Sequence, residues 1–171
     1  IIHGANDIVG ATGWMALIPP YTAEYDACGC FESYASGTGI GSQARKLLRD
    51  TAGYSGVLSQ KPIDEITSHD VFAALEADDP IAIQVLDKAI ELWGMATANL
   101  VSLFNPEKII FGGGVFGPAS RFIPRIYAEA CQWGQPISMK QVEYRASELQ
   151  GEAALLGAAH LALRSLPKTE N

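Results

Sequence analysis

Basic residues are scarce in this sequence of 171 residues. It has 12 Lys and Arg against 19 Asp and Glu, and its formal net charge is −7 at pH 7. Nucleic-acid-binding domains usually carry a basic patch, because contacts to phosphates provide much of their affinity. The scattered basic residues of this chain therefore argue against nucleic acid as its partner.

Long apolar runs are also missing, and none approaches the roughly 20 residues that a membrane-spanning helix needs. The first residues, IIHGANDIVG, have neither an initiator Met nor a basic region before an apolar run. We therefore do not interpret them as a signal peptide, and we expect the sequence to begin inside a longer chain. Three cysteines, an odd number, do not form a secreted disulfide framework. We expect a cytoplasmic protein without membrane contact, in which Cys131 is a buried core residue.

Helical patterns dominate what is present. Hydrophobic residues make up 48% of the sequence and charged residues 18%, as in an ordinary globular domain with a core. Apolar residues recur at steps of three and four over residues 81–104, which predicts a long helix with a wide buried stripe. Asp79 and Pro80 suit its first turn, and Asn105-Pro106 ends it.

Shorter segments are predicted before this helix. SYAS and SQARKLLRD indicate two helical pieces, separated by the three glycines within residues 37–41. A capping pair, Thr67 and Asp70, begins another short helix. Residues 1–31 predict strands and loops, with MALI (residues 15–18) as a short strand that ends at the prolines after it.

Strands and helices alternate after the long helix. KIIF (residues 108–111) predicts a fully buried strand, and a helix is expected from Pro118 to about Gln132. QVEYRA (residues 141–146) indicates a second strand. GEAALLGAAHLALRSL (residues 151–166) predicts a final helix whose small residues permit close packing. This order predicts an α/β fold with at least partly parallel strand pairing.

Gly112, Gly113 and Gly114 follow the predicted buried strand and precede a helix. Glycine lets the backbone approach a ligand closely, and α/β folds bind ligands at the carboxyl ends of strands. A tight turn is the simpler alternative. TGIG, residues 38–41, lacks the Gly-Lys-Ser/Thr ending of a phosphate loop and does not follow a strand, so we interpret it as a helix break.

The stretch ACGCFESYASG, residues 27–37, holds two cysteines and a carboxylate. A structural zinc site takes four Cys or His ligands, and no other Cys or His has a characteristic spacing to Cys28 and Cys30. A redox pair is usually C-x-x-C rather than C-x-C. Glu32 is the strongest polar candidate, either as an acidic residue favoured by the helix dipole or as an acceptor for ligand hydroxyls.

GCFESYASG, residues 29–37, resembles the G-C-x-E-x-x-x-S-G signature of the ROK family of sugar kinases and sugar-responsive repressors. Residues 66–115 are similar to that family's long helix, Asn-Pro stop, buried strand and glycine triplet. GEAALLGAAHLAL resembles its closing helix, and IIHGANDIVGATGWM resembles the lead-in to its G-E-x-G-H motif. The resemblance covers nearly the whole chain in order.

This resemblance implies an actin-like, ribonuclease-H-like ATPase fold, of which residues 1–171 form the C-terminal domain. The first phosphate loop and the catalytic Asp would lie upstream, so no catalytic residue is expected in this chain. The family uses ATP and Mg²⁺ to phosphorylate a sugar, chiefly by positioning groups and stabilising charge. Glu32 carries over as the residue that binds sugar hydroxyls, and Gly112, Gly113 and Gly114 carry over as nucleotide-side glycines.

The chain departs from the family pattern at two motifs. Ala11 and Trp14 stand where G-E-x-G-H has its Glu and its His, so Trp14 is the remaining candidate for a sugar contact there, with one donor and no metal ligand. The family's zinc knot is C-x-C-G-x-x-G-C, and its two earlier cysteine positions fall on Ala23 and Tyr25. Cys30 and, out of register, Cys28 are the candidate metal ligands, and a complete zinc site is not expected.

Three functions stay open on this basis. One is part of an ATP-dependent hexose or amino-sugar kinase. Another is the ligand-sensing domain of a repressor, or a catalytically inactive relative, in which a sugar is the effector. The third is an oligomerisation domain, since the long apolar helix and Trp93 suit a homodimer interface.

Overall fold

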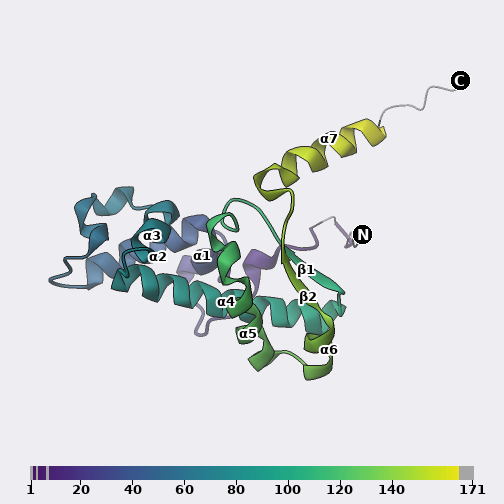
Figure 1. Cartoon of the computed structure of the whole chain (residues 1–171), viewed down its shortest axis with the longest axis horizontal. Coiled ribbons are helices and arrows are strands. Elements are labelled where there is room, and N and C mark those ends of the chain that lie inside the picture. The colour runs from purple at the N-terminus through teal and green to yellow at the C-terminus, as the bar shows by residue number, and fades with distance from the viewer. Residues whose placement is uncertain (1, 3, 7, 166–171) are drawn as a thin grey trace, which may run out of the picture.

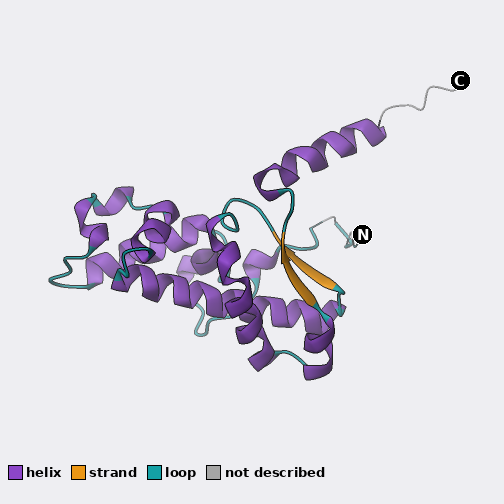
Figure 2. Cartoon of the chain, in the orientation of Figure 1, coloured by secondary structure: helices purple, strands orange, loops and turns teal. Residues whose placement is uncertain are grey.

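The computed structural model describes residues 2, 4–6 and 8–165 and is predominantly helical (Figures 1 and 2). Its longest element, α4 (Pro80–Phe104), runs through the middle of the molecule. The other helices are α1 (Glu32–Ala35), α2 (Gly37–Asp50), α3 (Ser68–Leu75), α5 (Ile123–Trp133), α6 (Pro136–Gln141) and α7 (Ala153–Ser165). The strands are β1 (Lys108–Phe111) and β2 (Glu143–Ala146).

The ends of α4 are set by local chemistry, as predicted. The Asp79 carboxylate accepts hydrogen bonds from the backbone N–H groups of Ile81 and Ala82, at 3.0 and 3.2 Å. Pro80 is the first helical residue, where a missing N–H has no cost. Asn105 ends the helix in the left-handed conformation, with φ of 41°. The predicted capping of α3 is also confirmed, because Thr67 N donates to the Asp70 carboxylate at 2.8 Å.

The core forms around α4, which packs on α1, α2, α3 and α5. Trp93 is only 4% exposed and lies inside this core. The suggestion that Trp93 contributes to a homodimer interface is therefore wrong, because its ring is covered by the chain's own side chains. Within the described residues, none of the helices combines the length and the apolar character that crossing a bilayer requires.

The two strands pair in parallel, with Lys108 opposite Glu143 and Phe111 opposite Ala146. The predicted α/β order and parallel pairing are therefore present. The expectation that β1 is fully buried is wrong for this chain. Phe111 is buried, but Ile110 is 66% exposed, since β1 has β2 as its single neighbouring strand in the described part of the chain.

The glycines within residues 37–41 do not break a helix, contrary to expectation. Gly39 and Gly41 lie inside α2, and the break falls at Ser36, whose hydroxyl accepts the N–H of Gly39 at 3.0 Å. A Cβ on Gly39 would collide with the backbone carbonyl of Glu32. These glycines allow α1 and α2 to approach closely. Helix propensity alone predicts a break here because it does not include contacts between helices.

Other local predictions are wrong because they depend on neighbours distant in sequence. MALI (residues 15–18) forms no strand, and Leu17 N donates within the same segment, to Met15 O. Cys131 is exposed, because α5 turns Ile126 and Ala130 toward the core instead. The predicted close packing of α7 is not seen either: residues 154–164 are exposed, and the helix stands away from the body (Figure 1).

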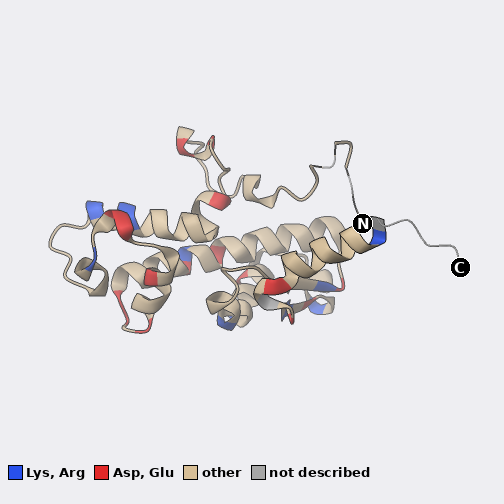
Figure 3. Ribbon diagram, turned by 90° about the horizontal axis from the view of Figure 1, so that it is seen from above, with Lys and Arg blue, Asp and Glu red and all other residues tan. Residues whose placement is uncertain are grey.

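Residues 8–31, which we call the N-terminal arm, contain two short 3₁₀ turns, at Thr12–Trp14 and Ala23–Tyr25. The arm rises from the helical body on the side of α1 (Figure 3). Within the arm, Gly13 packs against the backbone of Cys28 and against Glu32, the first residue of α1. This contact places the arm beside the start of α1.

Candidate functional site

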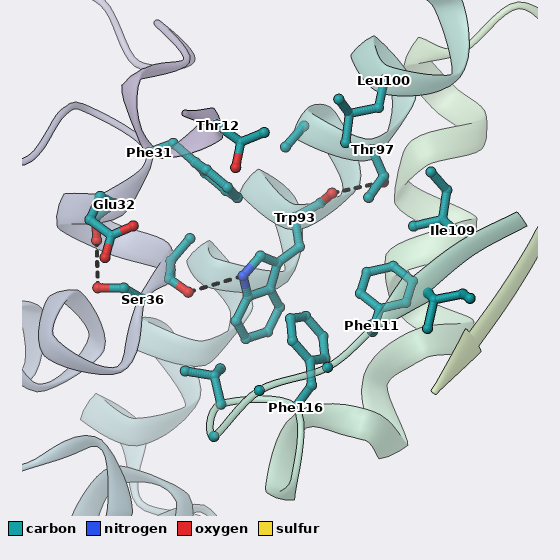
Figure 4. Close-up of a pocket in the computed structure, with 17 residues that line it drawn as sticks. Thr12, Phe31, Glu32, Ser36, Trp93, Thr97, Leu100, Ile109, Phe111 and Phe116 are labelled. Carbon is teal, nitrogen blue, oxygen red and sulfur yellow. Dashed lines mark hydrogen bonds between the residues drawn. The ribbon is translucent and has the colours of Figure 1, made fainter. Parts of the chain in front are cut away.

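A cavity of about 510 Å³ lies between α1, α4 and the turn that follows β1 (Figure 4). We call it the central cavity. Glu32 and Ser36 line it from α1 and its end, Trp93 and Thr97 from α4, and Gly112–Gly114 from the turn. The structure thus brings the carboxylate and the glycines that the sequence singles out to one cavity, although 80 residues separate them along the chain.

The glycine turn exposes its backbone to a ligand. Gly113 has a φ of +84°, a left-handed conformation that favours glycine. A Cβ built on Gly113 or Gly114 would meet nothing within 4 Å, so open space lies beside both residues. The turn is closed by Phe116 N, which donates to Gly113 O at 3.1 Å. The turn is therefore both tight and accessible. The glycines can serve a tight turn and the close approach of a ligand at the same time.

Glu32 is the first residue of α1, and its side chain is exposed. A Cβ on Gly13 would lie 2.9 Å from Glu32 Oε2, so the arm packs directly on this carboxylate. Glu32 also lines a second cavity of about 360 Å³ together with Glu24, Cys28 and Ser33. Glu32 therefore lines both the central cavity and this polar cavity.

The position of α1 is held from α4. Trp93 Nε1 donates to Ala35 O at 3.0 Å, as Figure 4 shows. The Trp93 ring packs on Phe116 with 5.0 Å between centroids, and Phe116 packs on Phe111 at 4.8 Å. One aromatic cluster thus connects α1, the strand β1 and the residues after the glycine turn, and it forms an apolar wall of the central cavity.

Trp14 lies elsewhere. It is 59% exposed and lines a third cavity, of about 370 Å³, within the arm. The structure therefore does not place Trp14 with Glu32 and the glycines. Thr12 reaches the central cavity instead, at the variable position of the motif. Thr97 also lines it, and the signal for Thr97 in the sequence is a polar residue within the apolar stripe of α4.

Cys28 and Cys30 face different surroundings. Cys30 is buried, with Sγ 3.9 Å from Ile18 O, whereas Cys28 is exposed, with Sγ 3.4 Å from Ser33 Oγ. Over the residues that the structure describes, no three or more His, Cys, Asp or Glu side chains gather as metal ligands. The expectations about zinc and about Mg²⁺ stay predictions.

A sequence model of the ROK family matches residues 1–165. The chain belongs to the ROK family. It is 31% identical to a glucokinase of Halalkalibacterium halodurans over 163 residues, covering 94% of this chain and 49% of that protein. It is 28% identical to the DNA-binding transcriptional dual regulator NagC of Escherichia coli over 134 residues, covering 77% of this chain and 31% of that protein.

Among solved structures, this ROK chain is similar to a ROK family glucokinase from Streptomyces griseus in complex with glucose and AMPPNP. The TM-score is 0.74 at 27% identity, over 90% of this chain and 51% of that one. The predicted actin-like ATPase fold is confirmed by this likeness. The chain spans about half the length of the glucokinases that it matches. Since kinases and regulators both match, membership alone does not separate the two functions.

Proposed function

We propose that residues 1–171 form the C-terminal domain of an ATP-dependent sugar kinase and supply its sugar- and nucleotide-binding groups. The supporting observation is that Glu32 and the turn Gly112–Gly114 line the same central cavity. Phosphoryl transfer needs the acceptor hydroxyl and the phosphate close together and in line. The central cavity can meet this requirement, because it offers the Glu32 carboxylate to the sugar and the open glycine turn to the nucleotide.

Glu32 would bind the sugar. An ionised carboxylate has two acceptor oxygens, and hydrogen bonds from hydroxyls to a charged acceptor are stronger than neutral ones. The substrate would be a hexose or an amino sugar. Thr12 also lines the cavity and carries a hydroxyl group that can hydrogen-bond a polyhydroxyl ligand. The Ser36 hydroxyl donates to Glu32 O at 2.9 Å and accepts from Gly39 N, so it can offer a ligand only a further acceptor site.

The backbone of the glycine turn would face the nucleotide. Residues Gly113 and Gly114 fit this role because no side chain occupies the space beside them. When bound, ATP supplies the phosphoryl group. The sugar hydroxyl would accept the γ-phosphoryl group, ADP would leave, and the hydroxyl proton would pass to the catalytic Asp expected upstream. This chain therefore positions the reactants and performs no proton transfer.

The test is ADP release by the intact protein, given ATP, Mg²⁺ and a panel of hexoses and amino sugars. We expect one sugar to raise ADP release clearly above the rate without sugar, and Glu32→Ala to remove that increase while nucleotide binding persists. If no sugar raises ADP release in a well-folded protein, the kinase proposal fails.

A regulator, or a catalytically inactive relative, is the second candidate. It is favoured by Ala11 and Trp14, which replace the Glu and His of the family motif. Such a protein would bind a sugar effector through Glu32 without releasing ADP. Calorimetry with the same sugars separates the two, since binding without turnover supports the sensor and turnover supports the kinase. Either protein would be a cytoplasmic homodimer in our proposal, a setting that suits the three free cysteines.

A further inference from the structure

The cavity within the N-terminal arm combines aromatic rings with one carboxylate. We call this cavity of about 370 Å³ the arm cavity. Trp14, Tyr21 and Tyr25 bring three aromatic rings to it, and Asp26 is the one charged side chain that lines it. Neither Glu32 nor the glycine turn lines the arm cavity, so its lining differs from that of the central cavity.

The rings are arranged as walls rather than as a stack. Tyr21 and Tyr25 have centroids 6.4 Å apart and an interplanar angle of 77°, so one ring stands nearly perpendicular to the other. Tyr25 is buried and also packs on Tyr34, with 6.4 Å between ring centroids. Trp14 and Tyr21 are 59% and 71% exposed. Two exposed aromatic side chains and one buried aromatic ring therefore line the arm cavity.

The electrostatic setting of the arm cavity favours a positive ligand. Residues 1–31 contain no Lys or Arg. In Figure 3 the arm carries acidic segments and no basic one among the residues described. Lys46 of α2 contacts the arm, but it forms an ion pair with Glu24 at 3.3 Å, so its charge is balanced there. Aromatic faces carry negative partial charge, so rings and carboxylate act in the same direction.

The arm cavity is less suited to a sugar. The Tyr21 hydroxyl donates to Asp26 Oδ1, so the donor of that hydroxyl is already used within the cavity wall. The remaining wall is largely aliphatic, from Ala16, Ile18 and Pro19. A sugar would leave several hydroxyls without partners against this wall, which is costly. An alkylated ammonium has no such requirement, because its charge is spread over methyl groups.

We propose that the arm cavity binds a small organic cation of the quaternary or alkylated ammonium class. Trp14 and Tyr21 would contact its methyl groups through their ring faces, Tyr25 would close the base, and Asp26 would balance the charge. The cavity volume lies within the usual range for small-molecule sites, so the cation can carry a substituent larger than methyl.

The test uses choline and tetramethylammonium as probes, with the intact protein and calorimetry or tryptophan fluorescence as the readout. Its decisive comparison is with 3,3-dimethyl-1-butanol, the neutral isostere of choline. We expect choline to bind at least about tenfold more tightly than the isostere, because that factor corresponds to a cation–π and charge contribution of about 1.4 kcal/mol. Equal binding of the two would make this an apolar pocket and overturn the proposal.

Variants assign the binding to the arm cavity. Trp14→Ala should abolish choline binding and its fluorescence change, and Asp26→Asn should weaken binding by about threefold or more. Trp133→Ala is the matched control, since Trp133 is also 59% exposed but lies on α5, away from the arm. Circular dichroism confirms folding. Choline binding that survives Trp14→Ala, or an absence of binding up to about 10 mM, would overturn the proposal.

Discussion

The indole Nε1 of Trp93 donates a hydrogen bond of 3.0 Å to the carbonyl oxygen of Ala35. This single contact joins the middle of α4 to the last residue of α1, the four-residue helix that begins with Glu32. Because such a short helix has little stability of its own, its position depends on contacts of this kind. The proposed sugar-binding carboxylate is thus held in place by a buried ring on another helix.

Trp93→Phe should therefore weaken both stability and sugar binding. The change leaves a buried carbonyl without its donor, which costs about 1–3 kcal/mol in the free energy of unfolding. It also frees α1, and a shift of about 1 Å at a positioning group is enough for a tenfold loss or more. Chemical denaturation and sugar calorimetry measure the two effects.

Trp133→Phe is the control for this change. Its indole also donates to a neighbour, Glu129 Oε1 at 2.9 Å, but on an exposed surface. Its substitution should change the free energy of unfolding by less than about 0.5 kcal/mol. Equal effects of the two substitutions on sugar affinity would show that Trp93 does not position Glu32.

Glu32→Gln should lower sugar affinity by about 10- to 100-fold, since hydrogen bonds to a charged group contribute about 1.5–3 kcal/mol. The amide keeps the size of the side chain, so folding and nucleotide affinity should stay unchanged. Glu91→Gln is the comparison, because Glu91 forms a surface pair with Lys88 at 2.8 Å. Unaltered sugar affinity in Glu32→Gln would remove Glu32 from the site.

Gly113→Ala should reduce nucleotide affinity and cost about 1–2 kcal/mol in stability, because an L residue is disfavoured at a left-handed φ. Gly53→Ala provides a close match. Gly53 has a φ of +75° and, like Gly113, open space where a Cβ would lie. The two variants should lose similar stability, but only Gly113→Ala should weaken nucleotide binding. A similar nucleotide affinity in both variants would contradict the role of the turn.

Asp70 should make stability depend on pH in the acidic range. Burial tends to raise the pKa of this carboxyl, but hydrogen bonds from Thr67 and Lys61 outweigh burial and lower the pKa from 3.8 to about 2. Because the folded-state pKa is depressed, the stabilisation is complete above about pH 4 and is lost as the pH falls toward 2.

The loss should amount to about 1–2 kcal/mol after allowance for solvent screening. Urea unfolding at pH 6 and near pH 2.5 measures it. Asp70→Asn should be less stable at pH 6 and should show a smaller decrease between the two pH values. An unchanged pH dependence in Asp70→Asn would assign the acid sensitivity to other carboxyls.

Features set by residues close together in the sequence could be predicted, and features set by contacts between distant segments could not. Asp79, Pro80 and Asn105 act on the backbone within a few residues, so the ends of α4 were predictable from the sequence alone. The exposure of Cys131 and Ile110 depends on which elements face them, and local sequence does not contain that information.

Some residues of the central cavity could likewise be predicted from the sequence, and others could not. Glu32 and the glycines were identified from a motif, and the structure then brought them to one cavity. Thr12 was missed because a threonine at a variable motif position has no distinctive pattern. Thr97 was missed although it interrupts the apolar stripe of α4, because a single polar residue there does not by itself indicate a site. Trp14 was identified through its motif position, yet the arm turns it toward a separate cavity.

The close approach of α1 and α2 at Gly39 has one more consequence. Glu32 contributes its carbonyl to that crossing and its carboxylate to the central cavity. Any side chain at position 39 would push this residue outward and move the carboxylate with it. Under the proposed kinase function, position 39 would therefore influence sugar binding without touching the sugar, because even one added methyl group there meets the backbone of Glu32.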